Sequence, residues 1–460
     1  MAARLFGTNG IREVVGERFT PEMVVRVAGA LAALRPPPSR FVVGWDGRTS
    51  SPAAAGLVSA TLALAGHRVI EVGLLPTPAI QYLVPRLRAE FGVIVTASHN
   101  PPEFNGIKCI ACDGLEVPRE TEEAVERGVA AGFGPTARFD GIGTIERHSS
   151  GATEYVEGIL SCVDRERIRG RGFSIVLDVG NGASAPTSPA LLRALGCRVR
   201  TLNAQVDGTF PGRRSEPTEA NLVDLRRAVP AFGADLGIAH DGDADRAVFV
   251  DRSGTMIPGE TMLALLAQDA VRRAGGGVVV SPVTASLSLE EAIRPFGGTV
   301  VYTRVGSPNV TREMQRRGAV LGGEENGGTI FPTFQLARDG AMSLAAVLDL
   351  LARTGRPLEE LVASVPRYAF VREKIACPVD RRAAAVESAA RTLAEGAIRV
   401  ERIDGVKVVR PEGWVLLRPS GTEPLLRVFA EAKDPATAER LAAEAMGALQ
   451  HALGASAGGP

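Results

Sequence analysis

Residues 234–250 read ADLGIAHDGDADRAVFV. Two apolar runs in this stretch flank a short polar break, which predicts a strand, a loop and a second strand. The break carries an aspartate at every second position: Asp241, Asp243 and Asp245. Alternate side chains of an extended segment point the same way, so we expect the three carboxylates to converge. Adjacent carboxylates repel one another unless a cation joins them, and hard oxygen ligands suit Mg²⁺.

Two other interpretations of residues 241–246 can be weighed. A helix–loop–helix calcium loop needs glycine at its sixth position and glutamate at its twelfth. Counted from Asp241, those positions hold Arg246 and Arg252, which excludes that site. A solvated acidic turn is the other alternative, but Gly242 and Ala244 offer little bulk to shield the acids from one another. The pattern therefore favours a magnesium site.

Bulk properties exclude several classes of protein. The chain has 460 residues, 45% of them hydrophobic, which predicts three or four domains. Its net charge is zero, so nucleic acid and anionic membranes are poor partners. No apolar stretch reaches membrane-spanning length, and Met1–Gly10 lacks the apolar centre of a signal peptide. Five cysteines do not suggest a disulfide framework, so we expect a cytoplasmic protein.

An internal repeat predicts the architecture. A helix, a glycine stop and a strand recur at 51–72, 188–202 and 287–303. Each repeat is followed by another helix, another strand and a polar loop, and the loops are 96–101, 241–246 and 323–328. Alternating helices and strands indicate α/β domains, in which ligands gather just outside the carboxyl ends of strands.

The last part of the chain follows another pattern. From about residue 366 we expect a strand, a helix over 381–395, a hairpin-like pair of strands and a closing helix over 435–453. The predicted fold is three related α/β domains with mixed sheets, followed by a C-terminal α+β domain. The predicted domains are 1–150, 151–254, 255–366 and 367–460.

A serine follows the strand expected at 92–95. Ser98 is followed by His99, Asn100 and two prolines, which stop the strand and stiffen the turn. We expect Ser98 to be exposed there, where it could act as a nucleophile or carry a phosphate. Taken alone, these residues would more often form an ordinary turn.

Two further loops carry groups suited to a sugar phosphate. The turn 418–424 offers a guanidinium, two hydroxyls and a glycine-opened backbone, which can cradle a phosphate, and Arg427 could reach the same anion. By turn chemistry alone, a plain hairpin turn is as good an account. Glu324 and Asn326 stand between paired glycines, where a carboxylate and an amide suit sugar hydroxyls. If this loop stood alone, a glycine-rich turn with solvated acids would be the better account.

Residues 180–185, GNGASA, follow a predicted strand and mimic a dinucleotide-binding loop. The acid expected at the end of the next strand is missing, since 197–202 contains none. Tight packing of a strand against a helix explains these glycines better than a nicotinamide site.

Four loops taken together resemble one family. In order they are TASHNP at 96–101, DGDADR at 241–246, GEENGG at 323–328 and RPSGTEP at 418–424. This set resembles the α-D-phosphohexomutases, which include phosphoglucosamine, phosphomanno- and phosphoglucomutases. The resemblance implies four domains around one central cleft. It also implies interconversion of hexose 6-phosphate and hexose 1-phosphate through a phosphoserine, with a hexose 1,6-bisphosphate as intermediate and activator.

The resemblance also assigns roles to residues. It implies that Ser98 carries the phosphoryl group. It implies that an oxygen of that phosphate binds Mg²⁺ together with Asp241, Asp243 and Asp245. Phosphoryl transfer and proton handling would involve Arg12, His99, Lys108 and Arg246. Sugar recognition and orientation would involve Thr303, Gly306, Glu324 and Asn326. The phosphate-binding residues of the last domain would be Arg418, Ser420, Gly421, Thr422 and Arg427.

The preferred sugar stays open at this point. Several bacterial branches of the family carry serine and then histidine in the sugar loop, where this chain has Asn326 and Gly328. This form is similar to archaeal-type enzymes and favours phosphoglucosamine mutase, with phosphomannomutase or phosphoglucomutase as the alternative. A non-catalytic sugar-phosphate-binding protein on the same scaffold is an alternative of another class. We expect small sugar phosphates as partners and a monomer or a homodimer.

Overall fold

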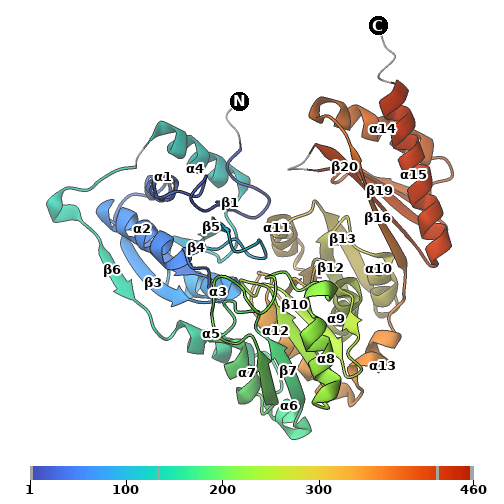
Figure 1. Cartoon of the computed structure of the whole chain (residues 1–460), viewed down its shortest axis with the longest axis horizontal. Helices are drawn as coiled ribbons and strands as arrows, with labels where there is room; N and C mark the ends of the chain where they lie inside the picture. The colour runs from blue at the N-terminus through green and yellow to red at the C-terminus, as the bar shows by residue number, and fades with distance from the viewer. Residues whose placement is uncertain (1–3, 133, 421–423, 456–460) are drawn as a thin grey trace.

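The computed structural model describes residues 4–132, 134–420 and 424–455. These residues form four β-sheets, each accompanied by its own helices. Figure 1 shows the first domain (blue) and the last domain (red) on opposite sides of the molecule, with the green and yellow elements between and below them.

The first sheet has six strands in the order β1-β5-β4-β2-β3-β6. Its strands are β1 (Ile11–Val14), β2 (Arg40–Trp45), β3 (Arg68–Leu74), β4 (Phe91–Val95), β5 (Phe104–Ala111) and β6 (Thr144–Arg147). Its helices are α1 (Pro21–Ala32), α2 (Ser51–Leu64), α3 (Thr77–Arg86) and α4 (Arg119–Ala131). Strands β2, β3, β4 and β6 are parallel, whereas β5 and β1 are antiparallel to their neighbours.

The second sheet has five strands in the order β11-β10-β9-β7-β8. Its strands are β7 (Ser174–Asp178), β8 (Arg198–Leu202), β9 (Leu236–His240), β10 (Ala247–Asp251) and β11 (Met256–Ile257). The helices of this part are α5 (Gly151–Leu160), α6 (Arg165–Arg171), α7 (Ser188–Ala194) and α8 (Val223–Ala231). Strands β9 and β10 pair antiparallel, so the strand–loop–strand prediction around 241–246 is confirmed.

The third sheet has four strands in the order β13-β12-β14-β15. Its strands are β12 (Gly277–Pro282), β13 (Gly298–Thr303), β14 (Leu321–Gly323) and β15 (Thr329–Ile330). Its helices are α9 (Gly259–Ala274), α10 (Leu287–Ile293), α11 (Ser307–Arg317), α12 (Gly340–Thr354) and α13 (Leu358–Ala363).

The first three sheets share one four-strand unit. Its strand order is β3-β2-β4-β5 in the first sheet, β8-β7-β9-β10 in the second and β13-β12-β14-β15 in the third. In each unit the last parallel strand, β4, β9 or β14, ends in a polar loop and an antiparallel strand follows it. The predicted repeat is therefore confirmed, including the position of the three loops at strand ends.

The last sheet is entirely antiparallel, in the order β16-β20-β19-β18-β17. Its strands are β16 (Ala369–Ala376), β17 (Arg399–Glu401), β18 (Val406–Arg410), β19 (Gly413–Pro419) and β20 (Leu425–Ala432). Helices α14 (Arg382–Leu393) and α15 (Pro435–Ala455) pack on one face of this sheet (Figure 1). The predicted fold class, three α/β domains and a C-terminal α+β domain, is confirmed. The predicted boundaries near 150, 254 and 366 remain a prediction.

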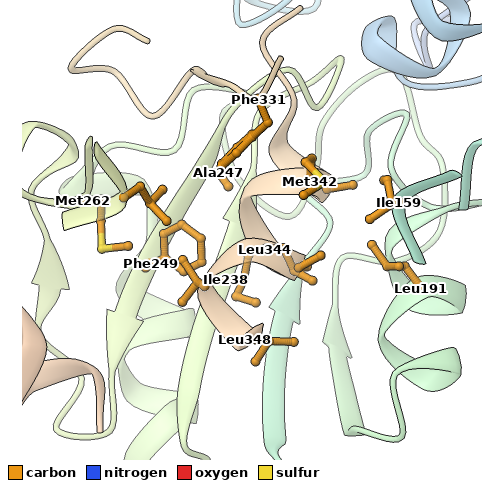
Figure 2. Close-up of a cluster of buried hydrophobic side chains, with 14 of the residues drawn as sticks. Ile159, Leu191, Ile238, Ala247, Phe249, Met262, Phe331, Met342, Leu344 and Leu348 are labelled. Atoms are coloured by element: carbon orange, nitrogen blue, oxygen red, sulfur yellow. The ribbon is translucent and has the colours of Figure 1, made fainter. Parts of the chain in front are cut away.

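Helix α12 joins the second and third sheets into one hydrophobic core. Leu344 of α12 lies beside Ile238 of β9 and Phe249 of β10, and all three are buried (Figure 2). Strands β9 and β10 lead into and out of loop 241–246, while α12 follows the loop 323–328. This packing therefore fixes two of the polar loops relative to each other.

The longest helix, α15, has 21 residues. It buries Leu441 and Leu449 against the last sheet and is not itself apolar all round. Within the described ranges, no helix combines the length and hydropathy that crossing a membrane would need.

Candidate active site

Ser98 occupies a strained turn just beyond β4. Its φ is +52°, in the left-handed region that non-glycine residues enter at a cost, typically where function requires it. Its backbone N–H donates to Thr96 Oγ1 at 2.9 Å. The expectation that Ser98 is exposed is wrong: its side chain is buried because loop 241–246 lies over it.

A buried arginine holds this turn in place. The two terminal nitrogens of Arg48 donate to the carbonyl oxygens of Ser98 (2.8 Å), Asn100 (2.6 Å), Pro101 (2.7 Å) and Phe104 (2.9 Å). Its Nε lies 3.1 Å from a carboxylate oxygen of Asp46. One guanidinium thus satisfies four carbonyls of one loop, which fixes the loop's shape rigidly.

The three aspartates converge, but not for the expected reason. Residues 241–246 are a tight turn and not an extended segment. Ala244 has a φ of +57°, and its N–H donates to the Asp241 carbonyl at 3.2 Å. This reversal brings one carboxylate oxygen from each of the three aspartates within 4.8 Å of the other two. The extended-strand rationale is therefore wrong, whereas the carboxylates do meet.

The carboxylates have unused acceptor capacity. Asp243 Oδ1 and Asp245 Oδ1 are buried and have no hydrogen-bond partner among the described residues. Burial, followed by the charges of Asp245 and Asp243, raises the pKa of Asp241 well above its usual value. Buried acceptors without donors are costly, and a hard divalent cation would satisfy them. The residues present therefore fit a metal ion such as Mg²⁺.

Lys108 and Thr77 hold one of the aspartates in place. Lys108 Nζ lies 2.9 Å from Asp243 Oδ2 and 3.7 Å from Asp245 Oδ2, and Thr77 Oγ1 donates to Asp243 Oδ2 at 2.7 Å. Burial alone would lower the pKa of Lys108, but the two carboxylates outweigh burial and raise it. Burial would likewise raise the pKa of Asp243, yet Lys108 and the other donors lower it. Both groups are therefore charged in this ion pair.

Arg338 connects two of the predicted loops and was missed by the sequence analysis. Its side chain is buried; one terminal nitrogen donates to Asp245 Oδ2 and the other donates to Glu324 Oε2 at 2.6 Å. It precedes Asp339, whose carboxylate caps α12 by accepting from Met342 N at 2.8 Å. The aspartate loop and the glutamate of the sugar loop therefore share one guanidinium. No local motif marks this residue, because its partners lie 93 and 14 positions away.

His99 lies between Ser98 and Arg246. Its Nδ1 is 3.4 Å from Ser98 Oγ and 3.1 Å from Arg246 Nη2. Burial, followed by the charges of Arg246 and Arg12, lowers the pKa of His99 to about 2. Because a guanidinium only donates, Nδ1 must be an acceptor, which places the proton of the neutral ring on Nε2.

Arg12 also reaches this cluster. It lies on strand β1, and its Nη1 donates to Asn100 Oδ1 at 3.0 Å. The first group of predicted residues, brought together around the Ser98 turn, is therefore Arg12, Ser98, His99, Lys108, Asp241, Asp243, Asp245, Arg246 and, through Arg338, Glu324.

A second group lies where the third and fourth sheets meet. Thr303 ends β13, and Gly306 precedes α11 with a φ of +120°. Arg418 Nε donates to Asp404 Oδ2 at 2.8 Å, and the same oxygen accepts from Val305 N at 3.2 Å. Asp404 thus links the turn at 418–424 with the segment 303–307.

The remaining predicted residues are placed as follows. Asn326 is exposed, and its Oδ1 accepts from Gly328 N at 3.1 Å. The Ser420 carbonyl accepts from Arg382 Nη1 at 2.6 Å, and Arg427 lies on β20. Gly421 and Thr422 lie outside the described residues.

Gly182 packs against the aspartate turn. A Cβ on Gly182 would lie 2.7 Å from the Gly242 carbonyl oxygen, which also accepts from Ala183 N at 2.9 Å. A Cβ on Gly242 would lie 2.6 Å from the Ser98 carbonyl oxygen. The loop that mimics a dinucleotide site is therefore a close-packed support for residues 241–246.

Gly242→Ala is expected to push the Ser98 turn and the aspartate turn apart. A displacement of about 1 Å can lower catalysis about 100-fold, so we expect a loss of this order in any activity of the site. Gly170→Ala in α6 is the matched control, because a Cβ there meets nothing within 4 Å. Equal activity of the two variants, measured side by side, would contradict the close contact.

The chain is similar to known proteins along most of its length. Models of the phosphoglucomutase/phosphomannomutase α/β/α domains I, II and III match residues 3–133, 153–254 and 258–368. The model of the C-terminal domain of the same family matches residues 375–448.

Curated relatives cover nearly the whole chain. A phosphoglucomutase/phosphomannomutase of Thermococcus kodakarensis is 39% identical over 98% of this chain and 99% of its own. A probable phosphoglucosamine mutase of Methanopyrus kandleri is 40% identical over 95% and 96% of the two chains. A phosphoglucosamine/phosphogalactosamine mutase of Sulfurisphaera tokodaii is 36% identical over 96% and 98%.

A solved structure has the same arrangement. The phosphoglucomutase/phosphomannomutase family protein of Burkholderia thailandensis superposes with a TM-score of 0.88 at 29% identity, covering 98% of both chains. All four domains and the relatives agree with the resemblance carried by the loops. The chain belongs to the phosphoglucomutase/phosphomannomutase family of the α-D-phosphohexomutase superfamily.

Proposed function

We propose that this protein is a phosphohexomutase that interconverts the 6-phosphate and 1-phosphate of a hexose through a phosphoserine at Ser98. The observation that carries the proposal is the position of Ser98 Oγ, 3.3 Å from Asp241 Oδ2. Three carboxylates meet at this point, and two of their oxygens are buried without a hydrogen-bond partner among the described residues. The strained backbone conformation of Ser98 at such a site supports a functional role for it.

The proposed reaction consists of two phosphoryl transfers. The phosphoryl group on Ser98 passes to the free hydroxyl oxygen of a hexose monophosphate, so the P–O bond to serine breaks as a P–O bond to the sugar forms. The sugar is then a 1,6-bisphosphate, and Ser98 Oγ regains the proton that the sugar hydroxyl lost. After the sugar turns over, Ser98 Oγ takes the other phosphoryl group and returns a proton to the sugar oxygen. Such transfers depend mainly on positioning and charge neutralisation.

The residues around Ser98 suit this chemistry. Asp241, Asp243 and Asp245, with an oxygen of the Ser98 phosphate, would hold Mg²⁺, which neutralises developing charge when it is bound. Neutral His99 presents Nδ1 as an acceptor 3.4 Å from Ser98 Oγ and 3.1 Å from Arg246 Nη2, so it suits positioning of these side chains and not the role of a base. We assign the cations of Arg12, Lys108 and Arg246 to charge neutralisation around the transferred group.

The rest of the substrate would be held by the other loops. We assign the sugar hydroxyls to Glu324 and Asn326 and the orientation of the ring to Thr303 and Gly306. The phosphate at the non-reacting end would bind the turn of the last domain, through Arg418, Ser420, Gly421, Thr422 and Arg427. A sugar that presents either end to Ser98 needs an anchor of this kind that accepts both phosphates.

Among hexoses, we propose glucosamine phosphate as the preferred substrate. Relatives at about 40% identity over nearly the full length carry the name probable phosphoglucosamine mutase, which supports this choice. The alternative is a phosphoglucomutase/phosphomannomutase, the name of an equally similar relative. A sugar-phosphate-binding protein without catalysis is the alternative of another class.

A coupled assay across glucosamine, glucose and mannose 1-phosphates, with a hexose 1,6-bisphosphate present, tests the proposal. We expect turnover of all three, with kcat/KM for glucosamine 1-phosphate at least about tenfold higher, a difference of about 1.4 kcal/mol. A higher value for glucose or mannose would favour the alternative mutase. Binding of all three without turnover would favour the non-catalytic protein.

A further inference from the structure

A lysine of the last domain is fully buried where that domain meets the third. Lys407 lies on β18 and is 0% exposed. Its Nζ donates to the carbonyl oxygens of Val283 at 2.9 Å and Ala285 at 3.2 Å. Both carbonyls belong to the loop between β12 and α10 of the third domain. Because a buried charge is costly unless it is hydrogen-bonded, the ammonium depends on these contacts across the domain boundary.

Aromatic rings and acids keep this buried ammonium charged. Its Nζ lies 3.9 Å from the ring centroid of Trp414 and 4.9 Å from that of Tyr302, within the range of a cation–π contact. Burial lowers the pKa of Lys407 to about 8, and the charges of Glu401 and Glu431 oppose this fall. The side chain is therefore mainly protonated at neutral pH, and hydrogen bonds from a charged donor are stronger than neutral ones.

A second contact with the third domain lies three residues before Lys407. Asp404 Oδ2 accepts from Val305 N at 3.2 Å. Val305 lies between Thr303 and Gly306, the residues to which we assign the orientation of the sugar ring. One short segment of the last domain therefore holds two loops of the third domain.

Val283 connects Lys407 with the segment that orients the sugar. Its carbonyl accepts from Lys407, and its N–H donates to the Thr303 carbonyl at 2.9 Å. Its side chain is buried in a cluster with Trp414 and Leu416 of the last domain. A shift of the ammonium would therefore be passed to Thr303, the last residue of β13.

Thr284 connects the same loop with the sugar-recognition loop. Its hydroxyl donates a hydrogen bond to the carboxylate of Glu325, which opposes the rise in the pKa of Glu325 that burial causes. Glu325 stands between Glu324 and Asn326, the residues that we assign to the sugar hydroxyls. The carbonyls on either side of Thr284 are the two that accept from Lys407, so the lysine also fixes this donor.

We propose that Lys407 is a positioning residue of the phosphohexomutase reaction, whose ammonium holds the loop 283–285 against the last domain and thereby fixes both sugar-binding segments of the third domain. The inference rests on the proposed function, because those segments are assigned to a hexose phosphate. Lys407 acts through Val283 and Thr284 and takes no part in the phosphoryl transfer at Ser98.

Lys407→Met removes the ammonium and keeps an unbranched side chain, with Lys433→Met as the matched control. Lys433 is an exposed lysine that also joins the last domain to the third, 3.3 Å from Glu291, and exposed pairs contribute little. We expect kcat/KM of Lys407→Met to fall at least about tenfold for hexose 1-phosphate and hexose 6-phosphate alike, because a displacement of about 1 Å can cost about 100-fold. Lys433→Met should match the wild type.

Two further measurements separate positioning from a general loss of structure. The calorimetric affinity of Lys407→Met for Mg²⁺ should match the wild type, because the aspartate turn 241–246 belongs to the second domain. After Ser98 is loaded with phosphate from hexose 1,6-bisphosphate, loss of that phosphate to water should keep its wild-type rate, since water needs no sugar-binding segment. Transfer to a hexose monophosphate should slow. Equal slowing of both steps, or a weaker affinity for Mg²⁺, would overturn the positioning role.

Thr284→Val tests the same chain of contacts and decides the question even if Lys407→Met does not fold. Valine keeps the branched shape of threonine and removes the hydroxyl that bonds Glu325. We expect a smaller fall in kcat/KM for both monophosphates. In a double variant the two losses should be less than multiplicative, because residues of one network are coupled. Unchanged kcat/KM in Thr284→Val, or losses that multiply, would overturn the proposal.

Failure of the proposed function would give a different result. If the wild type does not turn over hexose phosphates, or if Ser98 takes no phosphate from the bisphosphate, both proposals fail together. If the wild type is active and Lys407→Met behaves like Lys433→Met, the mutase stands and the positioning role of Lys407 is overturned.

Discussion

Ser98→Ala is expected to abolish turnover of every hexose phosphate, by roughly 10⁴-fold or more, as for the loss of a nucleophile elsewhere. Ser98 Oγ is the only atom of that side chain that can carry the phosphoryl group between the two ends of the sugar. Its neighbours, Asp241 Oδ2 at 3.3 Å and His99 Nδ1 at 3.4 Å, cannot replace it in the proposed exchange. The measurement is the coupled assay with hexose 1,6-bisphosphate present.

Ser59→Ala is the matched control for this variant. Ser59 is a buried serine of α2 in the same domain, and its Oγ has no hydrogen-bond partner within the described ranges. Its replacement should leave activity within about twofold, because alanine favours the helix and no partner is lost. Thermal unfolding of both variants should show that each is folded. Activity of Ser98→Ala near that of Ser59→Ala would exclude a phosphoserine mechanism.

Asp243→Asn is expected to weaken the binding of Mg²⁺ and to lower kcat by roughly 10³-fold, since a metal ion supplies several kcal/mol of charge stabilisation. Asp243 is held by Lys108 at 2.9 Å and by Thr77 at 2.7 Å. The amide keeps the shape but removes the charge, so two carboxylates remain to attract the cation. Calorimetric titration with MgCl₂ measures the affinity independently of activity.

Asp251→Asn is the control for the loss of a buried carboxylate. Asp251 ends β10, and its Oδ1 accepts from Ser253 N at 2.9 Å and Thr255 N at 3.0 Å, contacts that an amide oxygen can keep. We expect its Mg²⁺ affinity and activity to match the wild type. Unchanged affinity and Mg²⁺ dependence in Asp243→Asn would contradict the metal site.

The sequence predicted those parts of the fold that depend on local patterns. Apolar runs on either side of 241–246 predicted β9 and β10 because a buried strand must be apolar along its length. The glycine stop at Gly66 predicted the end of α2 for the same kind of local reason, whereas the helix has Ser50 as its N-cap without a side-chain hydrogen bond. The repeat was predicted from three copies of the same pattern of helix, glycine stop and strand. It also predicted that the three polar loops lie at strand ends.

The sequence did not predict features that depend on backbone reversal or on distant partners. Ala244 is left-handed, although alanine gives no sign of it, so the extended geometry expected for the aspartates was wrong. Arg338 donates to Asp245, which lies far from it in the sequence. Arg48 donates to backbone carbonyls, such as that of Ser98, which no sequence motif marks. Ser98 is buried by a turn that lies 143 residues away, which local reasoning could not foresee.

The proposed mechanism depends most directly on whether Ser98 carries a phosphoryl group that exchanges with the sugar. Peptide mapping by mass spectrometry, after incubation of the protein with hexose 1,6-bisphosphate and removal of the sugar, measures this. We expect one phosphate, located on Ser98, which disappears when hexose 1-phosphate is added and reappears in the sugar as the bisphosphate. An unmodified Ser98, or a phosphate that stays on the protein while the sugar is turned over, would contradict it.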